Sequence, residues 1–212
     1  MLVIEDLAAG RGQRAVARLR TLRLEQGEAA LLLGPSGAGK TTLLLAIAGL
    51  ARPFAGSASI DDVRVLDLKG AALDRFRGRH IGFIFQDIHL ISGLTTLDNI
   101  LLSPFAAGVP QDRAEAASLL ARLGLADKAS RPADRLSRGE AQRVAIARAM
   151  LMSPKVILAD EPTASLDDAA ADTVASLLLD AAAETGAALL IATHDQRLRR
   201  RIPRQVEIEV LS

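Results

Sequence analysis

The 212-residue sequence predicts a single α/β domain built around a largely parallel β-sheet. Three short apolar runs have the length of buried strands: "AALLL" at 29–33, "KVILADEP" at 155–162 and "AALLIATHD" at 187–195. Segments with helical periodicity separate these runs, and parallel strands need such crossover connections. Half of the residues are hydrophobic, which is enough for one substantial core and argues against a disordered chain.

The remaining elements follow from periodicity and turn signals. Short alternating apolar segments occupy 2–24, "GSASIDDVRV" at 56–65 is typical of a hairpin, and "HIGFIFQ" predicts a strand that ends at Gln86. Helices are expected at about 40–50, 97–102, 113–123 (with Gly124 as C-cap) and 168–184, followed by a short basic helix and a last strand, "QVEIEV". Only helical patterns occur from 87 to 135, so this stretch is interpreted as an insertion.

Composition excludes several classes of protein. The net charge is +1, from 26 basic and 25 acidic residues, which removes the broad electrostatic argument for nucleic-acid binding. There is no cysteine, hence neither a disulfide framework nor a thiolate metal site. Tryptophan and tyrosine are absent, so platforms for base stacking are scarce.

No targeting or membrane-spanning segment is predicted. The start, "MLVIEDLAAG", lacks the basic region of a signal peptide. The longest apolar candidate, 173–193, is interrupted by Asp180, Glu184 and Gly186. If this protein works at a membrane, we expect a partner to cross it.

A phosphate-binding loop follows the first apolar run and precedes a helical segment. "GPSGAGKT" matches the pattern G-x-x-x-x-G-K-[ST] in full. The residues expected to bind nucleotide are Gly34, Pro35, Ser36, Gly37, Ala38, Gly39, Lys40, Thr41 and Thr42. The glycines let backbone N–H groups converge on a β-phosphate at a helix N-terminus. Lys40 would reach the β- and γ-phosphates, Thr41 would ligate Mg²⁺, and Thr42 would touch the α-phosphate.

Two acids end the strand "VILADEP". The carboxyl ends of parallel strands are where ligands bind, which predicts that Asp160 and Glu161 lie beside the phosphates. Asp160 is expected to hold Mg²⁺ through water, and Glu161 to polarise the water that attacks in phosphoryl transfer. A strand ending in solvated acids is common in isolation, but the phosphate loop favours the functional interpretation.

A capped helix is predicted to begin at "LSRGEAQR". Ser137 would cap it and Glu140 would complete a capping box. Arg138 and Gly139 do not favour a helix in its first turn. We interpret the exposed N–H groups and positive dipole end as an anion site, with Gly139 leaving room for phosphate to approach the backbone.

The order of phosphate loop, "LSRGE", "VILADEP", "SLD" and "ATHD" resembles the ATP-binding subunits of ATP-binding cassette (ABC) transporters over essentially the whole chain. The resemblance implies a P-loop NTPase with a RecA-like, mostly parallel sheet and an N-terminal antiparallel β subdomain, formed by 1–86 and 136–212. Residues 87–135 would form an inserted α-helical subdomain. The segment "FIFQDIHLISGLTTLDNILL" resembles the compact ATPases of lipoprotein release and macrolide-type export, although amino-acid importers share much of it.

The resemblance also implies roles for single residues. Two cassettes would pack head to tail around two ATP molecules with Mg²⁺, so that Ser137 and Gly139 contact the γ-phosphate bound by the other subunit. Asp167 in "SLD" would touch the opposite site. The implied catalytic residues are Lys40, Gln86, Glu161 and His194, and the implied metal-binding residues are Thr41, Gln86 and Asp160. A lone glutamine or histidine at a strand end is usually structural; the combined motifs favour function here.

Two departures from the family pattern stand out. Family members usually offer an aromatic ring to the adenine near the end of the first strand, where this chain has "GRG". Arg11 either stacks on the adenine in its place or is an ordinary exposed loop arginine. Arg138 occupies a position where many members have glycine, and no role for it follows from the sequence.

The functional expectation is an ATPase subunit that drives a separate transmembrane permease. It would be cytoplasmic and peripheral on the inner face of the cell membrane, with membrane contact through the permease and no nucleic-acid partner. The alternative is a non-transport ABC ATPase that acts as a mechanical switch or on nucleic acid. A catalytically silent cassette disagrees with the presence of Lys40, Glu161 and His194.

Overall fold

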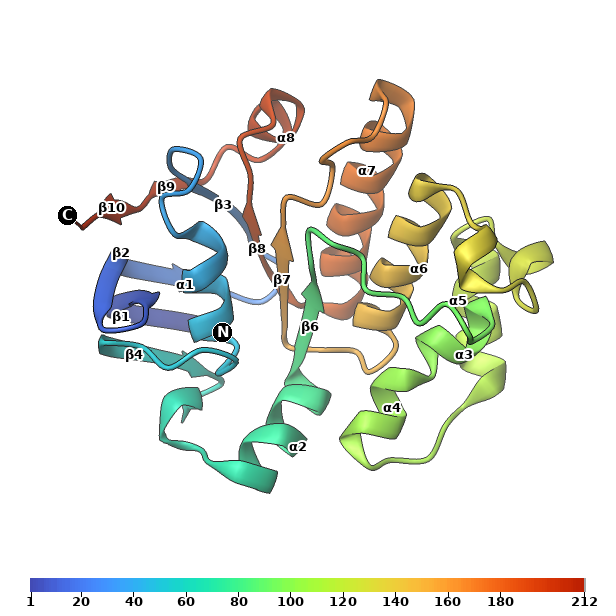
Figure 1. The fold of residues 1–212 in the computed structure, drawn as a ribbon, viewed down its shortest axis with the longest axis horizontal. Helices are drawn as coiled ribbons and strands as arrows, with labels where there is room; N and C mark the ends of the chain where they lie inside the picture. Colours follow the sequence, from blue (N-terminus) through green and yellow to red (C-terminus); the bar gives the residue numbers. More distant parts are fainter. Residues whose placement is uncertain (212) are drawn as a thin grey trace.

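A parallel sheet of five strands forms the centre of the fold, in the order β6-β7-β8-β3-β9 (Figure 1). Its members are β3 (Ala29–Leu33), β6 (Ile81–Ile84), β7 (Val156–Asp160), β8 (Ala188–Ala192) and β9 (Gln205–Glu207). The computed structural model describes residues 1–211, apart from the side chain of Arg11. The α/β class and the parallel arrangement predicted from the three apolar runs are confirmed.

The central strands are buried on both faces, which explains their continuous apolar sequence. Alternate residues of β3 contribute to separate cores, with Leu31 in one and Leu32 in the other. The first core lies under α6 (Arg138–Met150) and α7 (Asp168–Thr185), and the second under α1 (Lys40–Ile47) and the antiparallel sheet. The sheet is therefore the middle layer of three (Figure 1).

The antiparallel sheet has the order β10-β2-β1-β4-β5. Its strands are β1 (Leu2–Arg11), β2 (Arg14–Leu24), β4 (Ala55–Ile60), β5 (Val63–Arg64) and β10 (Glu209–Val210). The predicted hairpin at 56–65 is confirmed as β4 and β5. The short segments expected at 2–24 are instead one long hairpin, because β1 and β2 pair along nearly their whole length.

The expectation of one last strand at "QVEIEV" is wrong, since the chain changes sheet there. β9 pairs with β3 in the parallel sheet, and β10 pairs with β2 in the antiparallel sheet. Ile208 lies between them and is buried. Its side chain packs against Gly34, where a Cβ atom would lie only 2.7 Å from Cγ1 of Ile208. The buried side chain of Ile208 thus lies against the start of the phosphate loop, at the point where the chain passes from β9 to β10.

Short helices fill the stretch 87–135: α3 (Thr96–Ile100), α4 (Leu102–Ala107) and α5 (Arg113–Arg122), with 3₁₀ turns at 126–128 and 133–135. The helix expected at 97–102 is divided between α3 and α4. Asn99 is fully buried and fixes the preceding loop, since it accepts from the N–H of Ile91 at 2.7 Å and donates to its carbonyl at 3.1 Å. A buried amide satisfied by backbone in this way orders a segment without regular structure.

Helix α2 (Gly70–His80) was not predicted. None of its residues is fully buried, so it lacks the apolar stripe that periodicity analysis detects. It lies against α4 (Figure 1), and Gly78 makes this possible, because a Cβ atom there would lie 2.7 Å from that of Ala107.

The expected short basic helix is α8 (Gln196–Arg201), and its arginines are largely used within the chain. Arg201 donates to the carbonyl of Asp172 at 3.2 Å. Just beyond the helix, Arg204 pairs with Glu28 at 2.6 Å. The basic run "RLRRRIPR" therefore fastens the C-terminal segment to the fold.

The apolar stretch 173–193 is not one helix. Helix α7 ends at Thr185, Gly186 follows with φ 66°, and β8 begins at Ala188. Within residues 1–211, no helix combines the length and apolar character needed to span a bilayer.

Gly82 of β6 gives a test of the packing between sheet and helix. A Cβ atom there would lie 2.5 Å from the backbone oxygen of Ala149 in α6. We expect Gly82→Ala to lower the free energy of unfolding by about 1–3 kcal/mol, because strand and helix must move apart. Gly93→Ala is the control, since nothing lies within 4 Å of its added Cβ. Urea denaturation of both variants measures the difference, and equal stabilities would contradict this packing.

Candidate nucleotide-binding site

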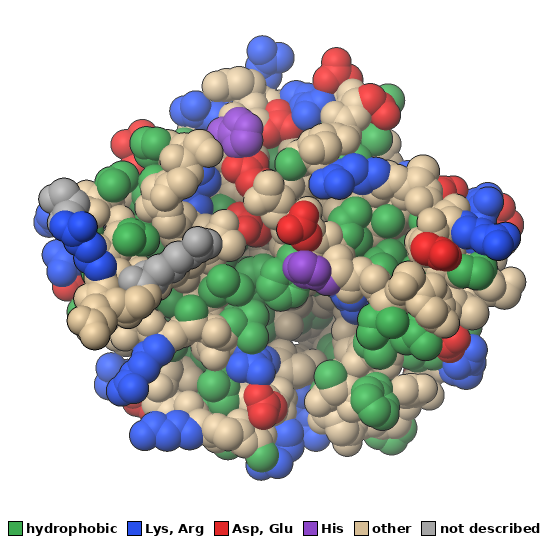
Figure 2. Space-filling view, in the orientation of Figure 1, with side chains coloured by type: hydrophobic (Ala, Val, Ile, Leu, Met, Phe, Trp, Pro, Cys, Tyr) green, Lys and Arg blue, Asp and Glu red, His purple; other side chains and the backbone are tan. Residues whose placement is uncertain are grey.

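A cavity of about 320 Å³ lies where the carboxyl ends of β3, β6, β7 and β8 meet the start of α1. The residues that line it are Val16, Ser36, Gly37, Gly39, Lys40, Thr41, Thr42, Gln86, Asp160, Glu161 and His194. They come from five separate stretches of sequence. Several acidic side chains lie near the middle of the face shown in Figure 2, with one histidine beside them and a second towards the upper edge. The cavity thus brings most of the residues predicted from the motifs into one place.

The phosphate loop connects β3 to α1 in a conformation that needs its glycines. Gly37 and Gly39 have φ values of 75° and 97°, in the left-handed region that favours glycine. A Cβ atom on Gly39 would also lie 2.8 Å from that of Ala17 in β2. Ala38 points into the core instead of the cavity. The loop is therefore shaped as much by the neighbouring hairpin as by its own residues.

Lys40 is 7% exposed and points back into its own loop. Its Nζ atom donates to the carbonyls of Gly34 and Pro35 at 2.9 and 3.1 Å. Two carbonyl oxygens replace part of the water that a buried ammonium group loses. The positive charge therefore lies at the wall of the cavity, where the two loop carbonyls hold it in position.

Asp160 is 3% exposed at the end of β7, and its Oδ1 atom has no hydrogen-bond partner among the described residues. Burial raises the pKa of Asp160, and the charge of Glu161 adds to this effect; hydrogen bonding from Thr41 and the charge of Lys40 act the other way. A buried carboxylate oxygen without a partner is costly unless a ligand completes it. With the Thr41 hydroxyl and the Gln86 amide in the same cavity, these oxygens suit a hard cation such as Mg²⁺.

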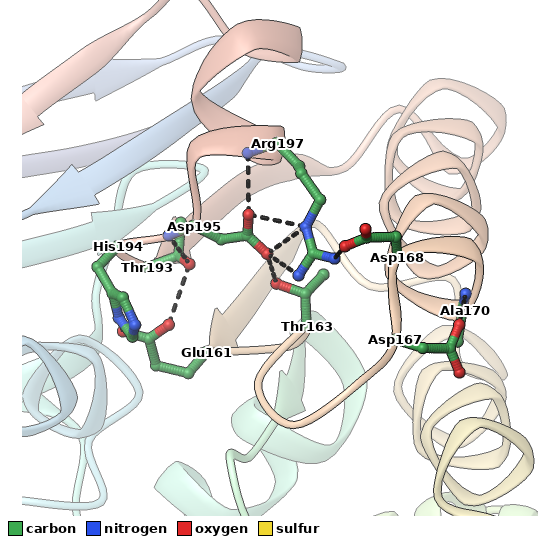
Figure 3. A network of polar contacts seen from close by, with 9 residues as sticks. All are labelled: Glu161, Thr163, Asp167, Asp168, Ala170, Thr193, His194, Asp195 and Arg197. Carbon is green, nitrogen blue, oxygen red and sulfur yellow. Dashed lines mark hydrogen bonds and ion pairs between the residues drawn. The ribbon is translucent and has the colours of Figure 1, made fainter.

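Glu161 and His194 form a pair at the edge of the cavity (Figure 3). Nδ1 of His194 lies 2.8 Å from Oε1 of Glu161, and the hydroxyl of Thr193 donates to Oε2 at 3.0 Å. Glu161 has φ 44°, a left-handed backbone that is rare for a residue with a side chain. Its N–H bonds to the carbonyl of Ala192 at 2.8 Å, which holds this conformation. The carboxylate is 11% exposed, whereas the imidazole is 79% exposed.

A second polar network lies beside this pair (Figure 3). Asp195 accepts from the hydroxyl of Thr163 at 2.6 Å and from Nη2 of Arg197 at 2.7 Å. The hydrogen bonds from Arg197, followed by that from Thr163, lower the pKa of Asp195 to about 2. The motif analysis missed Thr163, Thr193, Asp195 and Arg197. Their only signal was their position within two or three residues of Glu161 and His194.

Six of the predicted residues that the structure describes do not line the cavity. Gly34, Pro35 and Ala38 belong to its phosphate loop, whereas Ser137, Gly139 and Asp167 come from the starts of other helices. The capping box is confirmed, since Oγ of Ser137 accepts from the N–H of Glu140 at 3.3 Å and Glu140 accepts from that of Ser137 at 2.7 Å. Asp167 caps α7 through the N–H of Ala170 at 2.9 Å. Each of these three residues is thus part of a helix start that does not line the chain's own cavity.

The adenine end of the site is only partly described. The side chain of Arg11 lies outside the described part of the chain, so its stacking on adenine stays a prediction. Val16 of β2 lines the cavity beside the phosphate loop and was missed, because an apolar residue in a strand carries no motif. Arg138 is exposed, and the structure gives it no role.

Comparison with known proteins agrees with this geometry. Residues 19–164 match the ABC transporter family. The lipoprotein-releasing system ATP-binding protein LolD of Bacteroides fragilis is 39% identical over 200 residues, covering 93% of each chain. LolD of Maricaulis maris is 45% identical over 195 residues, covering 91% of this chain and 85% of that protein.

Solved structures give the same result. The dimeric post-hydrolysis state of the ATP-binding cassette MJ0796, bound to ADP and Pi, has a TM-score of 0.87 at 32% identity, covering 99% of this chain and 94% of that one. These relatives support a transport ATPase over the alternative of a mechanical or nucleic-acid-directed ATPase. The chain belongs to the ABC transporter family, as an ATP-binding and ATP-hydrolysing subunit.

Proposed function

We propose that the chain hydrolyses Mg²⁺-ATP as one half of a head-to-tail dimer and thereby drives a separate transmembrane permease. The observation that carries the proposal is the Glu161–His194 pair, which shares one cavity with Lys40 and Asp160. A carboxylate that can accept a proton, a histidine that can contact phosphate and a fixed cation suit phosphoryl transfer to water.

The phosphate loop would hold the triphosphate. The N–H groups at the start of α1 converge on the β-phosphate, where the helix dipole also favours negative charge. Lys40 would exchange its bonds to the carbonyls of Gly34 and Pro35 for the β- and γ-phosphate oxygens. Thr42 would contact the α-phosphate. Because these donors are already positioned, binding would need little rearrangement of the loop.

Thr41, Gln86 and Asp160 would hold Mg²⁺, with Asp160 acting through water. When bound, the ion neutralises charge on the β- and γ-phosphate oxygens. The orphaned Oδ1 atom of Asp160 supports this assignment, since an ion or its water would give that oxygen its missing partner. β6 ends at Ile84, so Gln86 lies in the loop after the strand and not at the strand end that the sequence predicted. From this loop it would in addition sense the γ-phosphate and relay its presence to the permease.

Glu161 would orient the attacking water and accept its proton. As the water oxygen bonds to the γ-phosphorus, the bond from phosphorus to the β,γ-bridging oxygen breaks and ADP leaves. His194 would position the γ-phosphate and the water, and its contact with Glu161 keeps both groups on the same side of the cavity. Thr193 holds the second carboxylate oxygen of Glu161, which limits rotation of the catalytic group.

The second ATP-contacting surface would come from the partner subunit. Ser137 and Gly139, at the positive end of the 13-residue helix α6, would contact the γ-phosphate held by the other chain. Asp167 would touch the opposite site. The position of these three residues outside the chain's own cavity and the dimeric MJ0796 cassettes support this assignment.

The relatives named as ATP-binding proteins of a lipoprotein-releasing system support a separate permease as the partner. We expect the subunit to be cytoplasmic and peripheral on the inner face of the cell membrane, held there through that permease. We expect no nucleic-acid partner, in line with the net charge of +1.

Glu161→Gln tests the mechanism. It keeps the shape of the side chain but removes the proton acceptor, so we expect hydrolysis to fall by about 10²–10⁴-fold while ATP binding remains. The ATP-bound variant is expected to accumulate as a dimer on gel filtration. Glu207→Gln, an exposed carboxylate outside the cavity, is the control and should behave as wild type. A monomeric Glu161→Gln with normal turnover would refute the mechanism.

Asp160→Asn tests the metal assignment. The nucleotide-free variant should melt no lower than the wild type, because it no longer buries an unpaired carboxylate whose pKa is raised by burial. Since ionisation of this buried group opposes folding, any stability gain should be present at neutral pH and vanish in acid. Hydrolysis should require a higher Mg²⁺ concentration, as measured by magnesium titration. An unchanged Mg²⁺ requirement would exclude Asp160 as a metal-binding residue.

Gly139→Ala separates folding from phosphate contact. The added Cβ would lie 3.7 Å from that of Ala170, an ordinary contact, so melting temperature should be unchanged or slightly higher. If phosphate approaches the backbone here, hydrolysis should fall by about tenfold or more, since one N–H donor is obstructed. ATP affinity of the monomer should not change. Wild-type turnover and dimerisation would rule out a phosphate contact at Gly139.

A further inference from the structure

The guanidinium group of Arg197 joins two loops that begin at the Glu161–His194 pair (Figure 3). One loop runs from His194 through Asp195 into α8, and the other from Glu161 to Asp168 at the start of α7. Both loops leave the carboxyl edge of the parallel sheet, from the neighbouring strands β8 and β7. Whatever fixes their separation also fixes the surroundings of the catalytic pair.

The first contact of Arg197 is with Asp195, which also accepts from Thr163. Its Nε atom lies 3.0 Å from both oxygens of Asp195, and Nη2 lies 2.7 Å from Oδ2. The same Oδ2 atom accepts from Thr163 on the other loop. The Asp195 side chain is 13% exposed, and its carboxylate is ionised at neutral pH because its pKa is about 2. The loop of His194 is therefore anchored immediately after the histidine.

The second contact reaches the start of α7. Nη1 of Arg197 lies 2.7 Å from Oδ1 of Asp168, the residue that follows the helix cap Asp167. The Asp168 side chain is 96% exposed, so this ion pair contributes little to global stability. Its physical consequence is geometric, since it ties the position of Asp167 to that of Asp195.

Most of the side chains that line the space between these two loops are polar. A cavity of about 290 Å³ lies between them, lined from both sides by Glu161, Thr163, Ser165, His194, Asp195 and Arg197, among others. Ser165 also has φ 61°, an uncommon backbone for a side-chain-bearing residue. Close-packed side chains would fix the spacing of the loops by contact. Here the hydrogen bonds of Arg197 to Asp168 and of Thr163 to Asp195 connect the two loops beside the cavity.

We propose that Arg197 is a positioning residue that couples His194 in one ATP site to Asp167, which faces the other. The inference rests on the head-to-tail dimer proposed above. Movement of Asp167 on contact with the partner's site shifts Asp168, and the rigid guanidinium transmits that shift to Asp195 and the adjacent histidine. Arginine suits this task because its planar fork can bond two carboxylates at once, which a lysine ammonium on a flexible stem does not do in fixed geometry.

The experiment compares Arg197→Gln, Arg197→Lys, Asp168→Asn and Arg200→Gln in steady-state ATP hydrolysis. Arg200 lies on the same helix, is exposed and does not line this cavity, so its variant is the matched control. For Arg197→Gln we expect kcat about tenfold lower with little change in KM, since misplaced catalytic groups slow chemistry more than binding. Arg197→Lys should rescue this loss only in part.

Asp168→Asn is the decisive variant, because its exposed side chain can be changed without unfolding the protein. We expect it to lower the Hill coefficient for ATP towards one and to reduce kcat by about two- to fivefold, the range set by one exposed ion pair. Combined with Arg197→Gln it should add nothing further, since both changes break the same bridge.

Each result decides the inference. Wild-type kcat and Hill coefficient in Asp168→Asn, or losses that simply multiply in the double variant, would overturn it. So would a wild-type Hill coefficient of one, since there would be no coupling to transmit. A lowered melting temperature in Arg197→Gln with unchanged kcat would overturn it too, since Arg197 would then only stabilise Asp195, the N-cap of α8. Absence of hydrolysis in the wild type would refute the proposed function itself, and the inference with it.

Discussion

The rest of the site depends on two charged groups buried at one edge of an apolar sheet. Lys40 and Asp160 are 7% and 3% exposed, and neither has an opposite charge among its hydrogen-bond partners in the described chain. Lys40 is satisfied by carbonyls, whereas one oxygen of Asp160 is not satisfied at all. Such an arrangement costs stability in the absence of ligand. In the proposed function, a polyanion with its cation would complete both groups at once, and relief of this cost would contribute to affinity for the ligand.

The geometry that keeps these charges in place comes from both sheets. Ala17 of the antiparallel hairpin leaves no room for a side chain at Gly39. Ile208 leaves no room for a side chain at Gly34. The phosphate loop is therefore clamped between β2 and the crossing of β9 into β10. A loop held on both sides is already ordered without a ligand, which reduces the entropy lost on binding.

The features predicted correctly from the sequence are those determined by interactions between residues close together in the chain. The buried strands, the loop "GPSGAGKT" and the capping box of Ser137 and Glu140 all depend on residues close in the chain. The division of the last strand depends on Ile208 reaching Gly34, and the support of the Glu161–His194 pair depends on Thr163 reaching Asp195, 32 positions away. Pairings of this kind leave no periodicity or spacing to detect. Helix α2 was not predicted for a different reason: it has too few buried residues to produce a periodic apolar pattern.

The division of the predicted residues into two groups is itself informative. Residues in the cavity include strained or unsatisfied groups, such as Glu161 at φ 44° and Oδ1 of Asp160. Ser137 and Asp167, in contrast, sit in well-formed helix caps that satisfy their own side chains. Strain and missing partners are retained where a ligand compensates for them, whereas a rigid cap suits a surface that must meet a separate molecule unchanged. Arg197 bridges the two groups, because it contacts Asp195 beside His194 on one side and Asp168 at the start of the capped helix on the other.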